Sequence, residues 1–305
     1  MNYQSVSVII PTYCRKDALF DLINNLKKQT VMPKEVFIID SSPIKSRLTS
    51  SETENLPNWI FYNTCENVVN IPYKRNLMIP LCTGEILIFF DDDSCFEDTI
   101  IKDYLICYNE TKADGISGLV LLPGEKKSHQ AIKNSNGLLM NCGPNVRNMG
   151  DIIQTKVICT ANFSIKKEVL LKIGGFDEQI RGTWDDTELG YRLHKAGYKI
   201  LHHPKPKTTH LKLNKGGTRG DGFNLEFTLT NIFYFHMRHS KNIPSIFFLF
   251  SAYWQYCRPG YRWLNFFDMI RKCFKVFLSY KEAKQRITSG PILIKNHKNN
   301  DYLNN

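Results

Sequence analysis

The chain has 305 residues and a hydrophobic content of 42%, enough to form one large domain or two ordinary ones. Its 40 basic and 29 acidic residues give a net charge of +11, which suits nucleotide diphosphates, phospholipid head groups or nucleic acid as partners. The nine cysteines form no Cys-x-x-Cys pair and are scattered through apolar segments, which argues against a zinc or disulfide framework. The first residues lead directly into a strand without a basic, apolar signal segment. Both observations favour a reducing, cytoplasmic location.

The first half of the chain alternates between short apolar strands and amphipathic helices. Strands are predicted at 6–11, 35–40, 59–63 and 84–90, and helices at 17–29 and 73–81. Such alternation predicts an α/β fold with a Rossmann-like, mostly parallel sheet flanked by helices. Neither a Gly-x-Gly-x-x-Gly fingerprint nor a P-loop follows the first strand, which argues against a dinucleotide-binding or P-loop site.

Three adjacent aspartates, Asp91, Asp92 and Asp93, follow the buried strand at 84–90. Ligands of open α/β sheets bind beyond the carboxyl ends of such strands. Carboxylates this close together repel each other unless a cation lies among them, and a hard divalent ion shared with substrate phosphates is the usual solution. The alternative is an acidic turn that caps a helix predicted at 97–108. Three consecutive aspartates favour the metal.

A second acidic group lies in the other half of the chain. A strand is predicted at 158–165, and helices are predicted at 167–173 and 184–198. Asp185 and Asp186 fall in the first turn of the last helix. Asp185 and Glu188 together resemble a capping box, so we expect one aspartate of the pair to cap the helix and the other to face the crevice. His202 and His203 are expected to end a strand before Pro204.

Five motifs, in this order, together resemble the family 2 glycosyltransferases, which have the GT-A fold. They are Val8-Ile9-Ile10-Pro11-Thr12-Tyr13-Cys14-Arg15, Ile38-Ile39-Asp40-Ser41-Ser42, Lys74-Arg75-Asn76 before Asp91-Asp92-Asp93, Gly174-Gly175-Phe176-Asp177, and Asp185-Asp186-x-x-Leu189. The resemblance covers roughly the first two-thirds of the chain.

This resemblance implies a role for each matching residue. The nucleotide-sugar is expected to contact Pro11, Thr12, Tyr13, Arg15, Asp40, Arg75, Asp91 and Asp92. Asp91 and Asp93 match the family's Asp-x-Asp and would bind Mg²⁺ or Mn²⁺, although spacing leaves open which two of the three aspartates do so. Asp186 matches the catalytic base, and Trp184 with Asp185 would bind the acceptor. His210 precedes a Gly-Gly-x-Arg loop similar to that of some bacterial members, which makes it a candidate third metal ligand.

The implied activity is inverting, metal-dependent transfer of a sugar from a nucleotide-diphosphate donor to a glycan or lipid-linked acceptor, as in bacterial surface polysaccharide synthesis (O-antigen or capsule). Residues 1–222 would form the GT-A domain, 223–294 a helical extension and 295–305 a disordered tail. The extension is aromatic and basic, as in helices that lie in membrane interfaces, so we expect peripheral contact with the cytoplasmic face of the inner membrane. Packing of this extension on the core is the alternative.

Two other functions use similar residues. A nucleotidyltransferase would also place carboxylates and Mg²⁺ beside a nucleotide, but it should have a Gly-rich phosphate loop after the first strand, where this chain has Pro11-Thr12-Tyr13-Cys14. A non-catalytic protein that binds nucleotides or nucleic acid through its basic surface would not need Asp93 or Asp186. Since no RNA- or DNA-reading motif is recognisable, nucleic acid is not expected as a partner.

Overall fold

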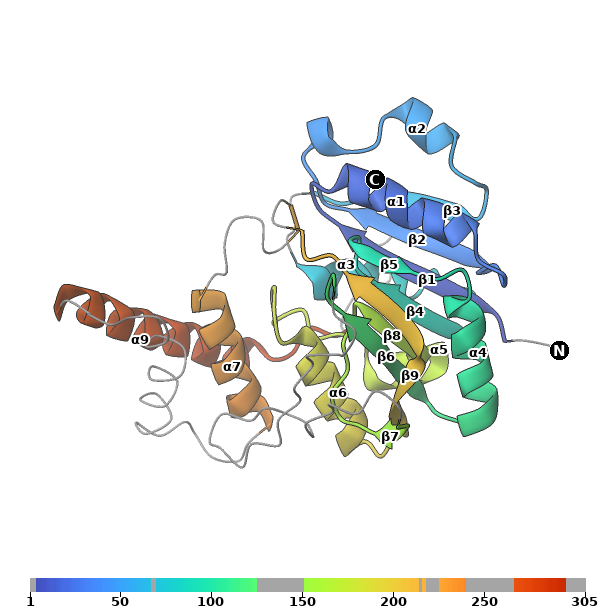
Figure 1. The fold of residues 1–305 in the computed structure, drawn as a ribbon. Helices are drawn as coiled ribbons and strands as arrows, with labels where there is room; N and C mark the ends of the chain where they lie inside the picture. Colours follow the sequence, from blue (N-terminus) through green and yellow to red (C-terminus); the bar gives the residue numbers. More distant parts are fainter. Residues whose placement is uncertain are drawn as a thin grey trace.

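A computed structural model of the chain describes residues 4–66, 70–124, 151–213, 216–217, 225–239 and 266–294. The strands are β1 Val6–Thr12, β2 Glu35–Asp40, β3 Ile60–Thr64, β4 Ile86–Phe90, β5 Ser94–Phe96, β6 Gly115–Leu121, β7 Ile153–Gln154, β8 Asn162–Lys166 and β9 Ile200–His210. The helices are α1 Lys16–Lys27, η1 Ile44–Ser46 (a 3₁₀ turn), α2 Ser50–Glu54, α3 Ile71–Met78, α4 Ile100–Thr111, α5 Lys167–Ile173, α6 Asp185–Lys195, α7 Leu225–His239 and α9 Phe266–Ser289. Figure 1 shows the strands as one sheet with helices around it. The predicted α/β class is confirmed.

The strands form a mixed sheet in the order β3-β2-β1-β4-β8-β6-β9-β5, with β7 paired to β9. Its first four strands are parallel, as the alternating sequence pattern predicts. In their register Thr12 lies opposite Asp40, so the polar residues that end these strands share one edge. Strand β8 runs antiparallel to both β4 and β6.

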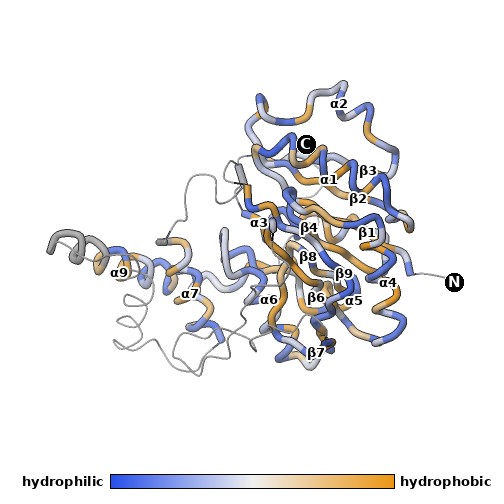
Figure 2. Tube along the Cα trace, viewed as in Figure 1, coloured by the Kyte–Doolittle hydropathy of each residue, from blue (hydrophilic) through white to orange (hydrophobic). Residues whose placement is uncertain are grey.

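Successive residues of the strands enter opposite layers of the core because side chains alternate across a sheet. Val8 and Ile10 of β1 pack in the layer that contains α1 and α4, whereas Ile9 packs in the layer that contains α5 and α6. Figure 2 shows these hydrophobic strands in orange at the centre of the molecule. Both faces of the sheet are therefore buried, which explains why the strands read as continuous apolar runs.

Strand β9 departs from the sequence expectation and carries His210 to the edge of the sheet. The strand does not end before Pro204, as predicted, but continues to His210. The register against β6 shifts between Ser117 and Leu119, and Pro204 lies in the stretch of β9 between His202 and Lys207, where the pairing with β6 is interrupted. A proline without an N–H donor is tolerated at such a place. Because β9 then pairs with β5, His210 lies opposite Ser94, directly after the three aspartates.

The C-terminal helices α7 and α9 pack on each other and on the loop before α6 (Figure 1). Their shared apolar cluster contains Leu229 and Phe233 of α7, Val276 and Ala283 of α9, and Ile180 of the loop. No described helix combines the length and apolarity needed to cross a membrane. The apolar run at 243–257 and the tail at 295–305 lie outside the described residues.

Candidate active site

A cavity of about 700 Å³ lies at the carboxyl ends of β1 and β4 and extends to the first turn of α6. Every residue predicted for the site lines this cavity, with the exception of Asp40. They are Pro11, Thr12, Tyr13, Arg15, Arg75, Asp91, Asp92, Asp93, Trp184, Asp185, Asp186 and His210. The topology thus gathers residues from five separate segments around one space.

Asp91, Asp93 and His210 form a cluster whose candidate ligand atoms all lie within 4.8 Å of one another. His210 Nε2 lies 3.0 Å from Asp93 Oδ1 and 3.7 Å from Asp91 Oδ2. Neighbouring ligands of an octahedral Mg²⁺, each about 2.1 Å from the ion, would lie roughly 3 Å apart. The spacing in the cluster therefore suits a divalent cation.

The hydrogen bonding of Asp93 also fits a metal. Its side chain is fully buried, and among the described residues Oδ1 accepts no hydrogen bond despite the nearby imidazole. Burial acts to raise the pKa of Asp93, but His210 and Arg15 outweigh it and lower that pKa, which keeps the carboxylate charged. A charged, buried oxygen without a hydrogen-bond donor is one that a cation can satisfy.

Asp92 faces other partners. Its Oδ2 accepts a hydrogen bond from Thr12 Oγ1 at 2.7 Å, and its Oδ1 accepts one from Arg15 Nη1 at 2.9 Å. Burial raises the pKa of Asp92 to about 6, although Arg15 acts in the opposite direction. Arg15 Nη1 also lies 2.9 Å from Asp93 Oδ2 and thus balances the charge of both carboxylates. The middle aspartate therefore links β1 to β4.

Arg75 lies in α3 with its guanidinium buried between two acids. Nη1 donates to Asp185 Oδ2 at 2.7 Å, and Nη2 donates to Asp91 Oδ1 at 3.3 Å. The rings of Phe176 and Phe89 lie 5.2 and 5.8 Å from its Cζ, within the range of cation–π contacts. Arg75 thus joins the acidic cluster after β4 to the acidic turn of α6.

The acidic turn of α6 differs from the predicted capping box. Trp184 occupies the N-cap position with a φ of 76°, and no side chain makes a capping hydrogen bond there. The capping prediction is wrong because Asp185 pairs with Arg75, while Glu188, one residue too late for the box, pairs with Arg192. Asp186 instead lines the cavity and accepts a hydrogen bond from its neighbour's backbone, Thr187 N, at 2.7 Å.

Burial, followed by the neighbouring charge of Asp185, raises the pKa of Asp186 to about 7. A carboxyl group with this pKa changes its protonation near neutral pH, as a general base requires. The same burial raises the pKa of Asp185, against the effect of Arg75. Of the two acids, Asp185 has a cationic partner at 2.7 Å.

Asp40 is held away from the cavity. Oδ1 accepts a hydrogen bond from Ser42 N at 2.7 Å, and Oδ2 accepts one from Tyr62 Oη at 2.5 Å. The neighbouring position on the cavity wall belongs to Lys74, whose Nζ donates to Thr12 O and Ser41 Oγ. No function was predicted for Lys74, because the sequence shows only a basic residue beside Arg75.

Another part of the cavity lining was not foreseen. It consists of Val120, Leu122, Cys159, Thr160 and Ala161. No sequence motif marks these residues, because β6 and β8 approach the site only through the sheet. Lys212 and Gly217, from the segment that follows His210, also line the cavity. Lys215 and Arg219, the basic residues of the Gly-Gly-x-Arg loop and its approach, lie outside the described residues.

The sequence profile of Glycosyl transferase family 2 matches residues 7–174. The match ends before α6 and β9. The chain is 25% identical over 208 residues to the O-antigen biosynthesis protein RfbC of Myxococcus xanthus, covering 64% of this chain and 16% of that protein. It is 21% identical over 203 residues to the O-antigen chain rhamnosyltransferase RfbN of Salmonella typhimurium, covering 65% and 63%. The chain thus spans less than two thirds of the length of either relative.

Two solved structures share the fold. GalNAc-T7, determined with UDP, GalNAc and Mn²⁺, aligns over 84% of this chain and 55% of its own, with a TM-score of 0.59 and 13% identity. The 1–349 segment of S. aureus TarS aligns over 94% of this chain and 92% of its own, with a TM-score of 0.58 and 14% identity. At these identities the likeness concerns the fold alone. The predicted GT-A fold is confirmed.

Proposed function

The chain belongs to glycosyl transferase family 2, and on this basis we propose that it is an inverting, metal-dependent enzyme. It would move a sugar from a nucleotide-diphosphate donor to a hydroxyl of a glycan or lipid-linked acceptor. The observation that carries this proposal is one cavity that contains both the Asp91–Asp93–His210 cluster and the carboxylate of Asp186. Family membership also favours sugar transfer over the nucleotidyltransferase and the non-catalytic binding protein.

In this proposal Asp91, Asp93 and His210 would hold Mg²⁺ or Mn²⁺. The ion, when bound, would stabilise the negative charge that develops on the leaving diphosphate. Pro11, Thr12, Tyr13 and Arg15 line the part of the cavity assigned to the nucleotide. Arg75 joins Asp91 to Asp185, and Asp92 accepts hydrogen bonds from Thr12 and Arg15. The expected contact of Asp40 with the nucleotide stays a prediction.

Asp186 is the proposed catalytic base, with Trp184 and Asp185 beside it on the acceptor side. Its carboxylate would take the proton of the acceptor hydroxyl as that oxygen attacks the anomeric carbon. The bond from this carbon to the donor diphosphate breaks in the same step. Because the acceptor oxygen attacks the anomeric carbon from the side opposite the departing diphosphate, a single displacement inverts the anomeric configuration.

The substrate class rests on the relatives. The names of two of them refer to O-antigen synthesis, and one of these is a rhamnosyltransferase. We therefore propose a hexosyl or rhamnosyl donor and a role in bacterial surface polysaccharide assembly. Such assembly from nucleotide-sugars fits a cytoplasmic location at the inner membrane.

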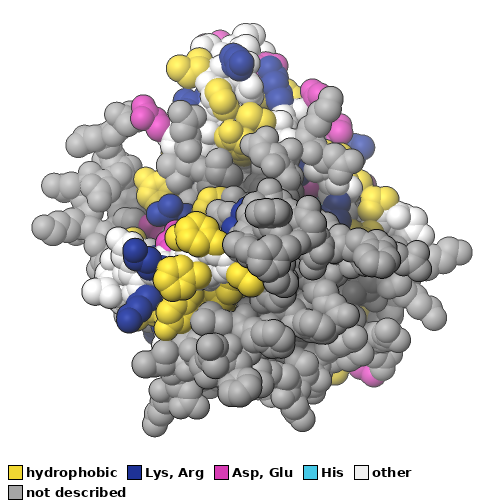
Figure 3. Space-filling view, turned by 90° about the vertical axis from the view of Figure 1, so that its left-hand side faces the viewer, with side chains coloured by type: hydrophobic (Ala, Val, Ile, Leu, Met, Phe, Trp, Pro, Cys, Tyr) yellow, Lys and Arg dark blue, Asp and Glu magenta, His cyan; other side chains and the backbone are white. Residues whose placement is uncertain are grey.

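An exposed face of α9 supports peripheral membrane contact. Phe274 and Phe277 are 58% and 57% exposed, and Leu278 continues the same face. The helix also presents Lys281 and Lys284 to solvent. Figure 3, which views the molecule from the side of α7 and α9, shows apolar side chains beside Lys and Arg on this surface. A helix that is aromatic on one face and flanked by lysines suits an anionic lipid surface.

The proposed function can be tested with the purified chain and a panel of UDP-sugars and dTDP-rhamnose. UDP or dTDP should raise the melting temperature only when Mn²⁺ or Mg²⁺ is present, because a ligand that binds the folded state stabilises it. The donor identified in this way should then release its nucleoside diphosphate when an acceptor is added. Failure of every nucleotide to bind with metal, or pyrophosphate release from a nucleoside triphosphate and a sugar phosphate, would contradict the proposal.

A further inference from the structure

The segment between α5 and α6 carries Trp184 and leads directly into Asp185 and Asp186. One face of α7 contacts this segment along its length. The contacting side chains recur three or four residues apart, as Thr228, Asn231, Phe235 and Arg238, with Tyr234 beside them, and the last residue of the helix, His239, contacts Glu188 of α6. The α7 helix therefore lies directly behind the turn that presents the proposed base.

Asn231 takes part in four hydrogen bonds and is fully buried. Its Nδ2 donates to Arg181 O at 2.6 Å and to Thr183 O at 2.8 Å. Its Oδ1 accepts from Arg181 N at 3.4 Å and from Arg286 Nη1 of α9 at 3.1 Å. One amide thus fixes the backbone immediately before Trp184, and its loss would remove the donor from both partly buried carbonyls.

Trp184 has a backbone conformation that needs support from outside. Its φ of 76° lies in the left-handed region, which is unfavourable for a bulky residue. The ring of Phe235 lies 5.7 Å from the Trp184 ring, and the hydroxyls of Thr183 and Thr228 lie 3.3 Å apart. The residues of α7 thus hold the turn in a conformation that its own sequence does not favour.

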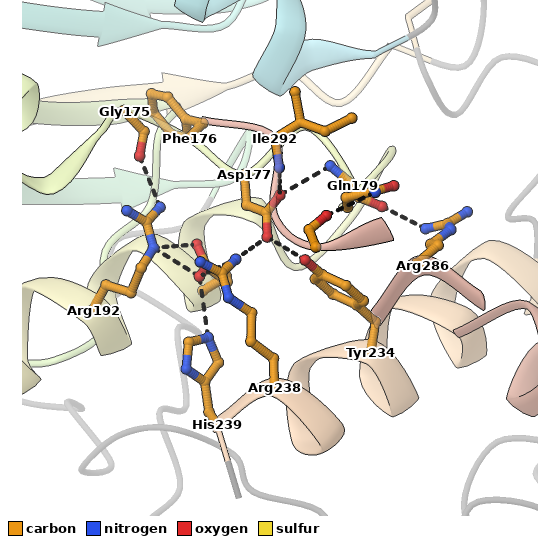
Figure 4. Close-up of polar contacts among 12 residues, drawn as sticks. Gly175, Phe176, Asp177, Gln179, Arg192, Tyr234, Arg238, His239, Arg286 and Ile292 are labelled. Atoms are coloured by element: carbon orange, nitrogen blue, oxygen red, sulfur yellow. Dashed lines mark hydrogen bonds and ion pairs between the residues drawn. The ribbon is translucent and has the colours of Figure 1, made fainter. Parts of the chain in front are cut away.

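Two buried carboxylates anchor the ends of the same segment, as Figure 4 shows. Asp177 at its start accepts hydrogen bonds from Tyr234 Oη at 2.7 Å and from Arg238. Glu188 in α6 pairs with Arg192 at 2.7 Å, with His239 at 3.1 Å and with Arg238 at 3.2 Å. Two of the three partners of Glu188 thus come from the end of α7.

We propose that α7 positions the catalytic base, with Asn231 as the principal positioning residue. The side chain of Asn231 does not line the cavity and would act through the backbone of residues 181–183. This inference rests on the proposed function, because it gives α7 a part in turnover through Asp186. It predicts that loosening α7 lowers turnover while the nucleotide and metal part of the site is unchanged.

Hydrogen exchange of the full chain tests the placement of the turn without any substrate. In Asn231→Ala, amides in the peptide covering 181–188 should exchange roughly tenfold faster, because two hydrogen bonds to the backbone of this segment are lost. Peptides from β1 and β4 should be unchanged. Thr230→Val is the matched control, since the neighbouring Thr230 contacts Glu282 of α9 at 3.4 Å rather than the turn. If Asn231→Ala does not fold, the milder change Phe235→Leu should produce the same faster exchange in the peptide covering 181–188.

A second experiment compares the turnover of the wild type and the variants per nucleotide-binding site. The number of binding sites is measured by calorimetry with Mn²⁺ and UDP or dTDP. Asn231→Ala should lower kcat by roughly 10- to 100-fold, because a small misplacement of a catalytic group is costly, whereas the nucleotide affinity should stay within about twofold. Unchanged exchange at 181–188, or an equal effect of Thr230→Val, would overturn the inference. Wild-type protein that binds no nucleotide would instead contradict the proposed function, and the exchange result would still decide whether α7 holds the turn.

Discussion

Asp91, Asp92 and Asp93 are neighbours in the sequence but have different partners in the structure. Asp91 and Asp93 face His210, whereas Asp92 turns to Thr12 and Arg15. The three residues lie in a turn between β4 and β5, closed by a hydrogen bond from Ser94 N to Asp91 O at 3.2 Å, and this turn places the first and third side chains beside His210. This geometry favours Asp91 and Asp93 as the metal-binding pair.

We expect Asp93→Asn to abolish nucleotide binding that depends on metal. The amide keeps the size of the side chain but removes the charge that the cation would neutralise. Calorimetry with Mn²⁺ and the nucleoside diphosphate identified above would measure the loss. Asp103→Asn, a change in α4 away from the cavity, is the control. Wild-type affinity in Asp93→Asn would remove this residue from the metal site.

Asp186→Asn should lower kcat by about two to four orders of magnitude, the usual contribution of a general base. In the wild type the base is active when deprotonated, so kcat/KM should rise with pH and level off above the pKa of about 7. The variant should lose this acidic limb and keep its nucleotide affinity. The measurement is a pH–rate profile of both proteins. A variant that retains both its rate and the limb would exclude Asp186 as the base.

At the scale of elements, β9 brings a candidate metal ligand to the site, and α9 forms an exposed apolar surface. Strand β9 brings His210 beside the aspartates only because it pairs with β5 at one edge of the sheet. Helix α9 buries Val276 and Ala283 against α7 and leaves Phe274, Phe277 and Leu278 exposed. One face of α9 therefore packs on α7, and the opposite face is available for the proposed lipid contact.

The exposed face of α9 gives a prediction for membrane binding. Replacing Phe274 and Phe277 with serine should reduce co-sedimentation with vesicles that contain phosphatidylglycerol, because the apolar contact is lost. Added salt should release the wild type only in part, since charge is screened and apolar contact is not. Ile44→Ser is the control, since Ile44 is 83% exposed on η1. Equal binding by all three proteins would contradict membrane contact through α9.

At the scale of the whole molecule, the C-terminal helices are tied to the core by charge as well as by apolar contact. Arg238 forms ion pairs with Asp177 and Glu188, and His239 Nε2 lies 3.1 Å from Glu188 Oε1, and both carboxylates are buried. Gly174 and Ile294 are also joined by a backbone hydrogen bond. These contacts argue against treating residues 1–222 as an independent unit, although the proposed boundary itself stays a prediction.

A chain that ends after Gly222 should consequently be poorly folded. Removing one partner of a buried ion pair typically costs about 3–5 kcal/mol, a large part of the roughly 5–15 kcal/mol that stabilises a domain. Urea unfolding followed by circular dichroism, together with sedimentation, would measure the effect. A chain that ends after Ile294 keeps every contact described and should match the full protein. Cooperative unfolding of residues 1–222 at the wild-type midpoint would show that the helices are dispensable for folding.

The sequence by itself determined those features that depend on local patterns. The apolar runs of β1 and β4 predict buried parallel strands, and the polar residues that follow them must meet at one edge. The same reasoning predicted the site around Thr12, Asp91 and Asp93, and the helix that begins near Asp185. These features follow from periodicity over a few residues, and most of their boundaries agree with the structure to within about three residues.

Only the tertiary structure decided which distant groups become partners. The pairing of β9 with β5 placed His210 beside Asp93, and the packing of α3 against α6 gave Arg75 the carboxylate of Asp185. The support of Trp184 by α7 depends on residues about 50 positions away in the chain, such as Phe235. The reason is physical: a local pattern fixes which face of an element is buried, but the partner on that face is chosen by the packing of the whole chain.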